Sequence, residues 1–137
     1  MTFLNATNAS SIPAAAELAR THDVAVVCAG TDSSEAEDRE SLSLDAGCDD
    51  CAGFTQDALI DAVASANPKT VVALSVPGAV LTPWRSRVGA ILAGFMLGQQ
   101  YGNALADVLF GDVPPSGRLP LTFPSTENET RLTPAQW

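Results

Sequence analysis

Two short runs of apolar, mostly β-branched residues constrain the fold of this chain more than any other feature. Residues 23–30 are Asp-Val-Ala-Val-Val-Cys-Ala-Gly, and residues 70–76 are Thr-Val-Val-Ala-Leu-Ser-Val. Both runs are nearly continuous in apolar character, whereas a strand with one face in water alternates apolar with polar side chains. They therefore predict two strands that are buried on both faces, as in a parallel sheet.

Helical segments are predicted before and between these strands. The Ala-rich residues 12–20 follow Ser11 and carry Pro13 at an early position, which is typical of a helix N-terminus. Residues 54–66 form a second helical segment, which Asn67-Pro68 ends. Its apolar positions at helical spacing are Leu59, Ile60 and Val63.

The second half of the chain repeats this alternation. Residues 88–95 predict a third strand, although Gly89 and Gly94 weaken the pattern. Residues 103–110 predict a helix. Its expected buried side consists of Ala104, Leu105, Val108 and Leu109. Strands and helices in this order predict an α/β fold, a three-layer sandwich whose mainly parallel sheet has helices on both faces.

Length and composition limit the function classes. At 137 residues, with 46% hydrophobic and 17% charged residues, the chain suits one domain. We expect that domain at residues 12–124, an N-terminal extension at 1–11, and a C-terminal extension or linker at 125–137. The net charge of -9 argues against nucleic acid as a partner. No apolar run approaches the roughly 20 residues of a membrane span, so a soluble chain is expected.

The loop after Gly30 is the first candidate for a functional site, because open α/β sheets bind ligands at the carboxyl ends of their strands. Residues 31–53 are polar and acidic, with Leu42 and Leu44 as expected anchors in the core. On this pattern alone, the ordinary interpretation of Glu35 is a solvated charge in an acidic loop. Further along, Trp84 is expected to pack beneath the link after the second strand.

The cysteines and the single histidine suggest no established chemistry. Cys48 and Cys51 are spaced for a small-loop disulfide, for free thiols or for a redox pair, and the lack of a second Cys or His pair argues against structural zinc. Cys28 is expected to be a small core residue. His22 precedes a strand, at the wrong end of the sheet for a Ser-His-Asp triad. We expect neither a metal site nor a cofactor.

Three Asn-x-Ser/Thr triplets would accept glycans in a secreted eukaryotic protein. They begin at Asn5, Asn8 and Asn128. They favour a secreted or extracytoplasmic location, although no signal peptide is visible in residues 1–20.

The order of short motifs resembles the C-terminal α/β domain of glycoside hydrolase family 3. The resemblance runs from about residue 13 to residue 124, with its most specific part in the closing segment 98–124. The matching motifs are Gly30, Ser33-Ser34, Glu35, Asp38-Arg39, Leu42-Ser43-Leu44, Gln56-Asp57-Ala58-Leu59, Asn67-Pro68, Pro77-Gly78-Ala79-Val80 and Pro83-Trp84.

This resemblance implies a catalytic role for Glu35. It occupies the position at which β-glucosidase-type members hold the general acid/base, a carboxyl group that protonates the leaving oxygen and then activates water. The resemblance also implies that Ser34, Asp38 and Arg39 bind substrate. Asp38 and Arg39 are expected to form an ion pair that shapes the loop. The implied substrate is a β-linked glucoside or oligosaccharide, as in carbohydrate metabolism.

The resemblance also implies that the chain is one part of a catalytic unit. The family's nucleophilic Asp belongs to an N-terminal barrel domain, which nothing in this sequence matches, and the first strands of the full α/β domain are also missing. The isolated chain, as a fragment or subunit of a retaining β-glucosidase or β-xylosidase-like enzyme, is expected to be inactive without the barrel.

The chain departs from the family pattern at three places. Ala36 follows the acid residue where the family often has Gly, and residues 98–100 are Gly-Gln-Gln in place of Gly-Gln-Glu. Residues 45–53 are longer than the usual connection and suggest an insertion over the site.

Two other functions remain open. The chain could be a non-catalytic structural or interaction subunit that keeps the fold without the hydrolase activity. A flavodoxin-like binding module is a more distant interpretation, because the sequence carries no nucleotide fingerprint.

Overall fold

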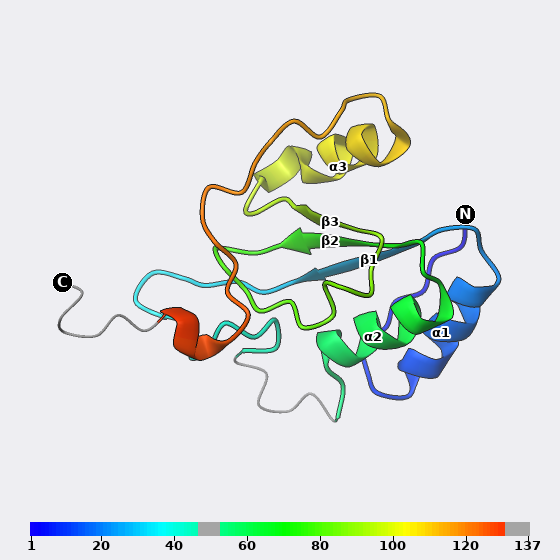
Figure 1. Ribbon diagram of the computed structural model, residues 1–137, viewed down its shortest axis with the longest axis horizontal. Coiled ribbons are helices and arrows are strands. Elements are labelled where there is room, and N and C mark those ends of the chain that lie inside the picture. The colour runs from blue at the N-terminus through cyan, green and yellow to red at the C-terminus, as the bar shows by residue number, and fades with distance from the viewer. Residues whose placement is uncertain (47–52, 131–137) are drawn as a thin grey trace.

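The fold is built on one sheet of three parallel strands. The computed structural model describes residues 1–46 and 53–130 (Figure 1). The strands follow one another across the sheet in the order β1, β2, β3, with Ala25 opposite Thr70 and Val71 opposite Ala90. Their bounds are β1 Ala25–Gly30, β2 Thr70–Ser75 and β3 Ala90–Ala93. The helices are α1 Ser11–Arg20, α2 Gln56–Ala66 and α3 Tyr101–Phe110, with short 3-10 turns at η1 Gly98–Gln100 and η2 Glu127–Thr130.

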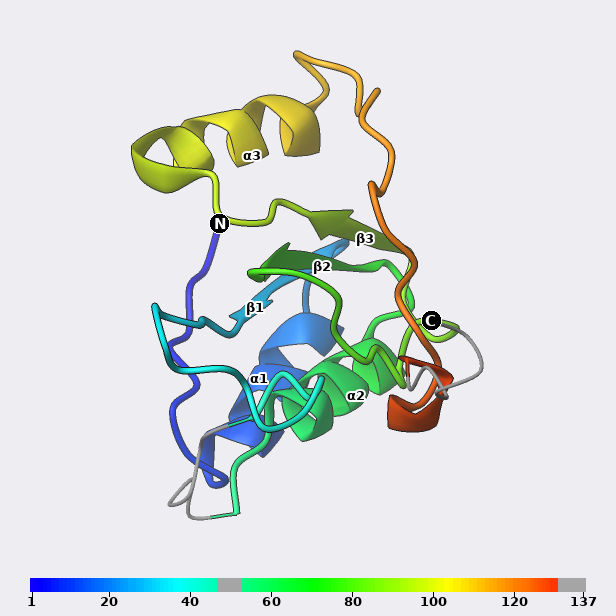
Figure 2. The ribbon, with the colours of Figure 1, turned by 90° about the vertical axis from the view of Figure 1, so that its left-hand side faces the viewer.

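The helices lie on opposite sides of the sheet. Figure 2 shows α1 and α2 together below the strands and α3 above them. The predicted α/β sandwich with a parallel sheet is therefore confirmed, and the third strand is confirmed in a form shortened to four residues.

Side-chain hydrogen bonds lie at the starts of the first two helices and at the end of the second. Ser11 is the first residue of α1, and its backbone N–H donates to Asn8 Oδ1 at 3.1 Å. Thr55 caps α2, because its hydroxyl accepts from the Ala58 N–H at 3.1 Å. Asn67 ends α2 as expected, and its buried amide donates to Ala19 O, which ties the end of α1 to the end of α2.

The core lies between the sheet and the α1–α2 layer. The central strand β2 is buried on both faces, as the sequence predicted, with Val72 and Leu74 completely inaccessible. Leu44 is 2% exposed and Trp84 is fully buried, as expected, whereas Leu42, the other expected anchor, is only partly covered. The Trp84 indole N–H donates to Asp57 Oδ1 at 2.7 Å, which satisfies a donor that has no access to water.

This bond generates a prediction about stability. Asp57→Ala is expected to lower the free energy of unfolding by about 1–3 kcal/mol, because a buried N–H would lose its acceptor. Asp57→Asn keeps an acceptor oxygen and should cost less. Denaturant titrations of both variants test this, and equal losses would contradict it.

The same carboxyl group has a pH signature. Burial raises the pKa of Asp57 above its ordinary value of 3.8, the Trp84 hydrogen bond opposes the shift, and Asp45 and Asp61 add to it. Its stabilising contribution is therefore present at low pH and is lost as the pH rises through the raised pKa. The free energy of unfolding of Asp57→Asn minus that of wild type should therefore be larger at pH ~7 than at pH ~3. The exposed Asp112→Asn serves as the control.

Two expectations about burial were wrong. β1 is covered on only one face, since Val26 is 46% exposed and Cys28 is exposed rather than a core residue. The reason is that β1 is an edge strand whose second face has no helix over it among the described residues. No residue of α3 is buried: Ala104 is exposed, and the other expected members of its apolar side are only partly covered.

Close packing explains one glycine at the start of the candidate loop. A Cβ atom at Gly30 would lie 2.4 Å from the Ser75 carbonyl oxygen, which the sheet holds in place. Gly30→Ala is therefore expected to lower the free energy of unfolding by about 1–3 kcal/mol.

The matched control is Gly102→Ala in α3, where a Cβ meets nothing within 4 Å. It should raise the free energy of unfolding by about 0.5–1 kcal/mol, because Ala loses less conformational entropy in a helix. Denaturant titrations of the two variants should therefore differ in sign.

Candidate active site

The candidate site lies where the loops after β1 and β2 meet. Because the strands are parallel, their carboxyl ends share one edge of the sheet, and both loops leave from it (Figure 1). The Thr31 N–H donates to Ser75 O at 3.2 Å, and the Leu81 N–H donates to Leu42 O at 2.8 Å. The first bond ties the start of the first loop to the end of β2, and the second bond holds the first loop against the second.

Glu35 lies at the tip of a tight turn. The Glu37 N–H donates to Ser34 O at 3.2 Å, and the Ser34 hydroxyl donates to Glu37 Oε2 at 3.0 Å. Glu35 and Ala36 occupy the two central positions between them, and both are exposed. Within the described residues, no hydrogen bond or ion pair engages the Glu35 carboxylate, so it is free to contact another molecule or domain.

The backbone of this turn explains a departure seen in the sequence. Ala36 has φ +63°, the left-handed conformation that glycine adopts at least cost. A Gly at this position, which is frequent in the family that the sequence resembles, would form the same turn without a Cβ clash. The turn is therefore retained in this chain at the expense of local strain.

Ala36→Gly is expected to raise the free energy of unfolding by about 0.5–1 kcal/mol, because the strain relieved exceeds the entropy that glycine loses. Ala46→Gly, at a residue without a positive φ, should lower it instead. Denaturant titration measures both, and a loss of stability in Ala36→Gly would contradict the strain argument.

Arg39 anchors the far side of the turn. Its Nη2 donates to Ala79 O at 2.9 Å, which links the first loop to the second. Its Nη1 is buried and has no hydrogen-bond partner among the described residues. The expected ion pair between Asp38 and Arg39 is absent from the described residues, because the guanidinium is directed to a backbone carbonyl instead.

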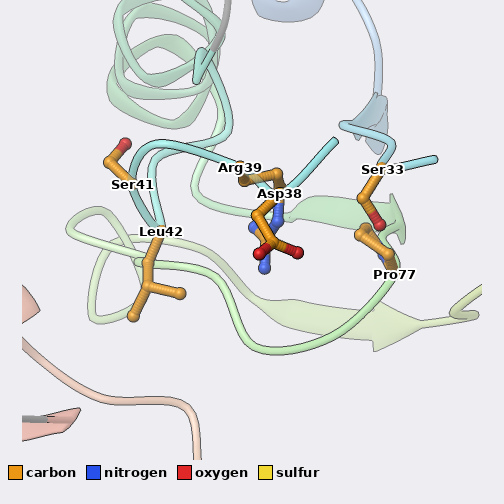
Figure 3. A pocket seen from close by; sticks show the side chains of 6 residues that line it. All are labelled: Ser33, Asp38, Arg39, Ser41, Leu42 and Pro77. Carbon is orange, nitrogen blue, oxygen red and sulfur yellow. The ribbon is translucent and has the colours of Figure 1, made fainter. Parts of the chain in front are cut away.

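An open pocket of about 430 Å³ lies beside this anchor. The Asp38 and Arg39 side chains lie in its middle, between Ser41 and Leu42 on one side and Ser33 and Pro77 on the other (Figure 3). Two of the candidate residues, Asp38 and Arg39, are therefore together, whereas Ser34 and Glu35 are not among the residues that line the pocket.

Sequence reasoning missed part of this lining. Ser33 was named only as part of the Ser33-Ser34 motif, Ser41 was not named, and the carbonyl that receives Arg39 could not be chosen from sequence. The available signal was coarse: α/β sheets bind ligands at the carboxyl ends of their strands, and Pro77 follows the second predicted strand.

The remaining candidates in the described part of the chain do not line this pocket. His22 is exposed and forms a hydrogen bond of 3.1 Å with the Thr2 hydroxyl, near the start of β1. Asn5, Asn8 and Asn128 are all exposed. Cys48 and Cys51 lie outside the described residues, so the alternatives for this pair stay predictions.

Two further kinds of feature are absent from residues 1–46 and 53–130. No group of three or more His, Cys, Asp or Glu side chains is arranged to hold a metal ion in this part of the chain. None of its helices has the length and apolar character needed to cross a bilayer.

The family assignment follows from a comparison with known families. The model of the glycosyl hydrolase family 3 C-terminal domain matches residues 4–136, which is nearly the whole chain. This chain belongs to glycoside hydrolase family 3. The resemblance that the motifs suggested is therefore confirmed.

Curated relatives of this family 3 domain are β-glucosidases. It is 44% identical over 115 residues to a β-glucosidase of Rhizobium radiobacter, and 40% identical over 118 residues to β-glucosidase B of Emericella nidulans. These alignments cover 84% and 85% of this chain but only 13% and 14% of the relatives. The chain thus corresponds to about one seventh of the length of these proteins.

Solved structures of β-glucosidases also match this chain. DesR, a β-glucosidase from Streptomyces venezuelae solved with D-glucose, is 44% identical and has a TM-score of 0.76 over 86% of this chain and 14% of its own. The β-glucosidase of Kluyveromyces marxianus, solved with glucose, is 35% identical and has a TM-score of 0.79 over 92% of this chain and 15% of its own. The family 3 domain therefore has the fold of the matching part of these enzymes.

Proposed function

We propose that this family 3 domain supplies the general acid/base of a retaining β-glucosidase-type hydrolase, and that Glu35 is that group. The observation that carries the proposal is the position of Glu35: an exposed carboxylate at the tip of a tight turn, on the edge of the sheet where α/β folds bind ligands. The membership in a family whose relatives here are β-glucosidases supports it.

The chemistry requires a carboxyl group that changes its role during the reaction. In the first step Glu35 would donate its proton to the glycosidic oxygen as the bond to the leaving group breaks. In the second step the Glu35 carboxylate would take a proton from the water that hydrolyses the glycosyl-enzyme. An exposed carboxylate that no other group of the described chain engages is suited to both steps.

The nucleophile would come from outside this chain. A retaining mechanism needs a second carboxylate about 5–5.5 Å from the first, on the opposite face of the sugar. We propose that a family 3 barrel domain, in the same or another chain, carries it, and that this chain alone is inactive. Its short share of the relatives' length supports this division.

The other candidate residues would surround the leaving group. Asp38 lines the pocket, Arg39 holds the loop in place, and the Ser34 hydroxyl stabilises the turn through Glu37. We propose a β-linked glucoside or oligosaccharide as the substrate. We also propose an extracytoplasmic location, which the exposed Asn5, Asn8 and Asn128 triplets support.

A chimera tests the role of Glu35. The residues of this chain would replace the matching segment of the Rhizobium radiobacter β-glucosidase, to which they are 44% identical. In that chimera Glu35→Gln is expected to lower kcat/KM for phenyl β-glucoside by about 10²–10⁴-fold, because the leaving group is no longer protonated. The effect on 2,4-dinitrophenyl β-glucoside should be much smaller, since that leaving group needs no proton.

The matched control is Glu40→Gln, an exposed glutamate of the same loop, which should leave both substrates unaffected. Full activity of Glu35→Gln on phenyl β-glucoside would reject the assignment. Hydrolysis by the isolated chain would reject the need for a barrel.

A further inference from the structure

The side chain of Gln56 contacts both ends of the loop that contains the Glu35 turn. Gln56 is the first residue of α2, and its amide contacts two backbone positions of the loop. Its Oε1 accepts from the Gly30 N–H at 2.8 Å, and its Nε2 donates to Gly30 O at 2.9 Å and to Leu44 O at 2.9 Å. We propose that Gln56 is a positioning residue that sets where the Glu35 turn stands, an inference that rests on the proposed role of Glu35.

The contact at Gly30 satisfies backbone groups on the outer side of β1. Gly30 is the last residue of β1, which is an edge strand among the described residues, so its N–H and C=O have no neighbour on the outer side. The Gln56 amide pairs with both groups at once, in the way that the backbone of an adjacent strand would. It therefore fixes the direction in which the chain leaves the sheet, five residues before Glu35.

The contact at Leu44 closes the loop. Leu44 is 2% exposed, so its backbone is held by a side chain packed in the core. Gln56 joins this fixed point to Gly30, and Glu35 lies between the two. A shift of either end would move the turn as a whole.

Gln56 is itself rigidly held. Its backbone N–H donates to Asp45 Oδ1 at 2.9 Å, and the Thr55 hydroxyl caps the helix that it opens. Both N–H bonds of the side-chain amide and its oxygen are used, so the amide has a single favourable orientation. Glu cannot replace Gln56 in these contacts, because its carboxylate would turn an oxygen toward the carbonyl oxygens of Gly30 and Leu44.

The expected consequence concerns proton transfer. A displaced general acid fails mainly with leaving groups that need a proton, because a shift of about 1 Å can cost 10²-fold in rate. A leaving group that departs unprotonated is nearly indifferent to the displacement. A loss that depends on the leaving group therefore separates positioning of Glu35 from general damage to the fold.

The test uses Gln56→Glu and Gln56→Ala in the chimera described above. Both variants are expected to lower kcat/KM for phenyl β-glucoside by about 10- to 100-fold and that for 2,4-dinitrophenyl β-glucoside by less than about 3-fold. The matched control is Asn67→Ala, which breaks hydrogen bonds to Ala19 and His22 near the opposite end of the sheet. It should reduce stability but affect both substrates equally.

Equal losses on the two substrates, or no loss, would overturn the proposal. If Glu35→Gln shows the leaving-group dependence and the Gln56 variants do not, only the positioning role fails. If the loss in Glu35→Gln does not depend on the leaving group either, the acid/base assignment is rejected, and the positioning role that rests on it is rejected as well.

A second measurement does not depend on activity. In the folded wild-type chain, hydrogen exchange followed on the Gly30 amide is expected to be slow, because Gln56 accepts its hydrogen bond, and the exposed Glu40 amide gives the fast reference. Exchange at Gly30 as fast as at Glu40 would overturn the proposal, including in the case where the variants fail to fold.

Discussion

The parallel pairing of β2 with both of its neighbours determines most of what this domain can do. Among the described strands only β2 has both faces buried, and its register with β1 and β3 brings the ends of all three to one edge. Loops that are far apart in sequence must then share that edge. The bond from Leu81 to Leu42 and the contact of Arg39 with Ala79 follow from this arrangement.

The sequence predicted the strands and helices because their patterns are local. Apolar periodicity, the Asn67-Pro68 stop and the helix-forming residues 12–20 each report on their own segment, and the structure confirms them. Burial is not local. The apolar run at Val26 and Cys28 suggested two covered faces, but coverage depends on which elements lie beside the strand, and nothing in that run encodes it.

The same limit applies to the candidate site. The family pattern pointed to the loop after β1, and it marked Ala36 as unusual, which the positive φ explains. It could not tell that Arg39 would be directed to a carbonyl of another loop rather than to its neighbour Asp38, because a carbonyl acceptor carries no signature in the sequence. The sequence named Gln56 only as part of a family motif and predicted none of its three side-chain hydrogen bonds, since their partners are distant in the sequence.

The single side chain at the base of the loop has a consequence for how such domains diversify. Because Gln56 holds Gly30 and Leu44 together, the two ends of the path between these residues keep a fixed spacing at the base of the loop. Residues can be added or exchanged within that path without changing the spacing of the strands. New specificities could therefore arise there by insertion and deletion, while the framework beneath is inherited unchanged.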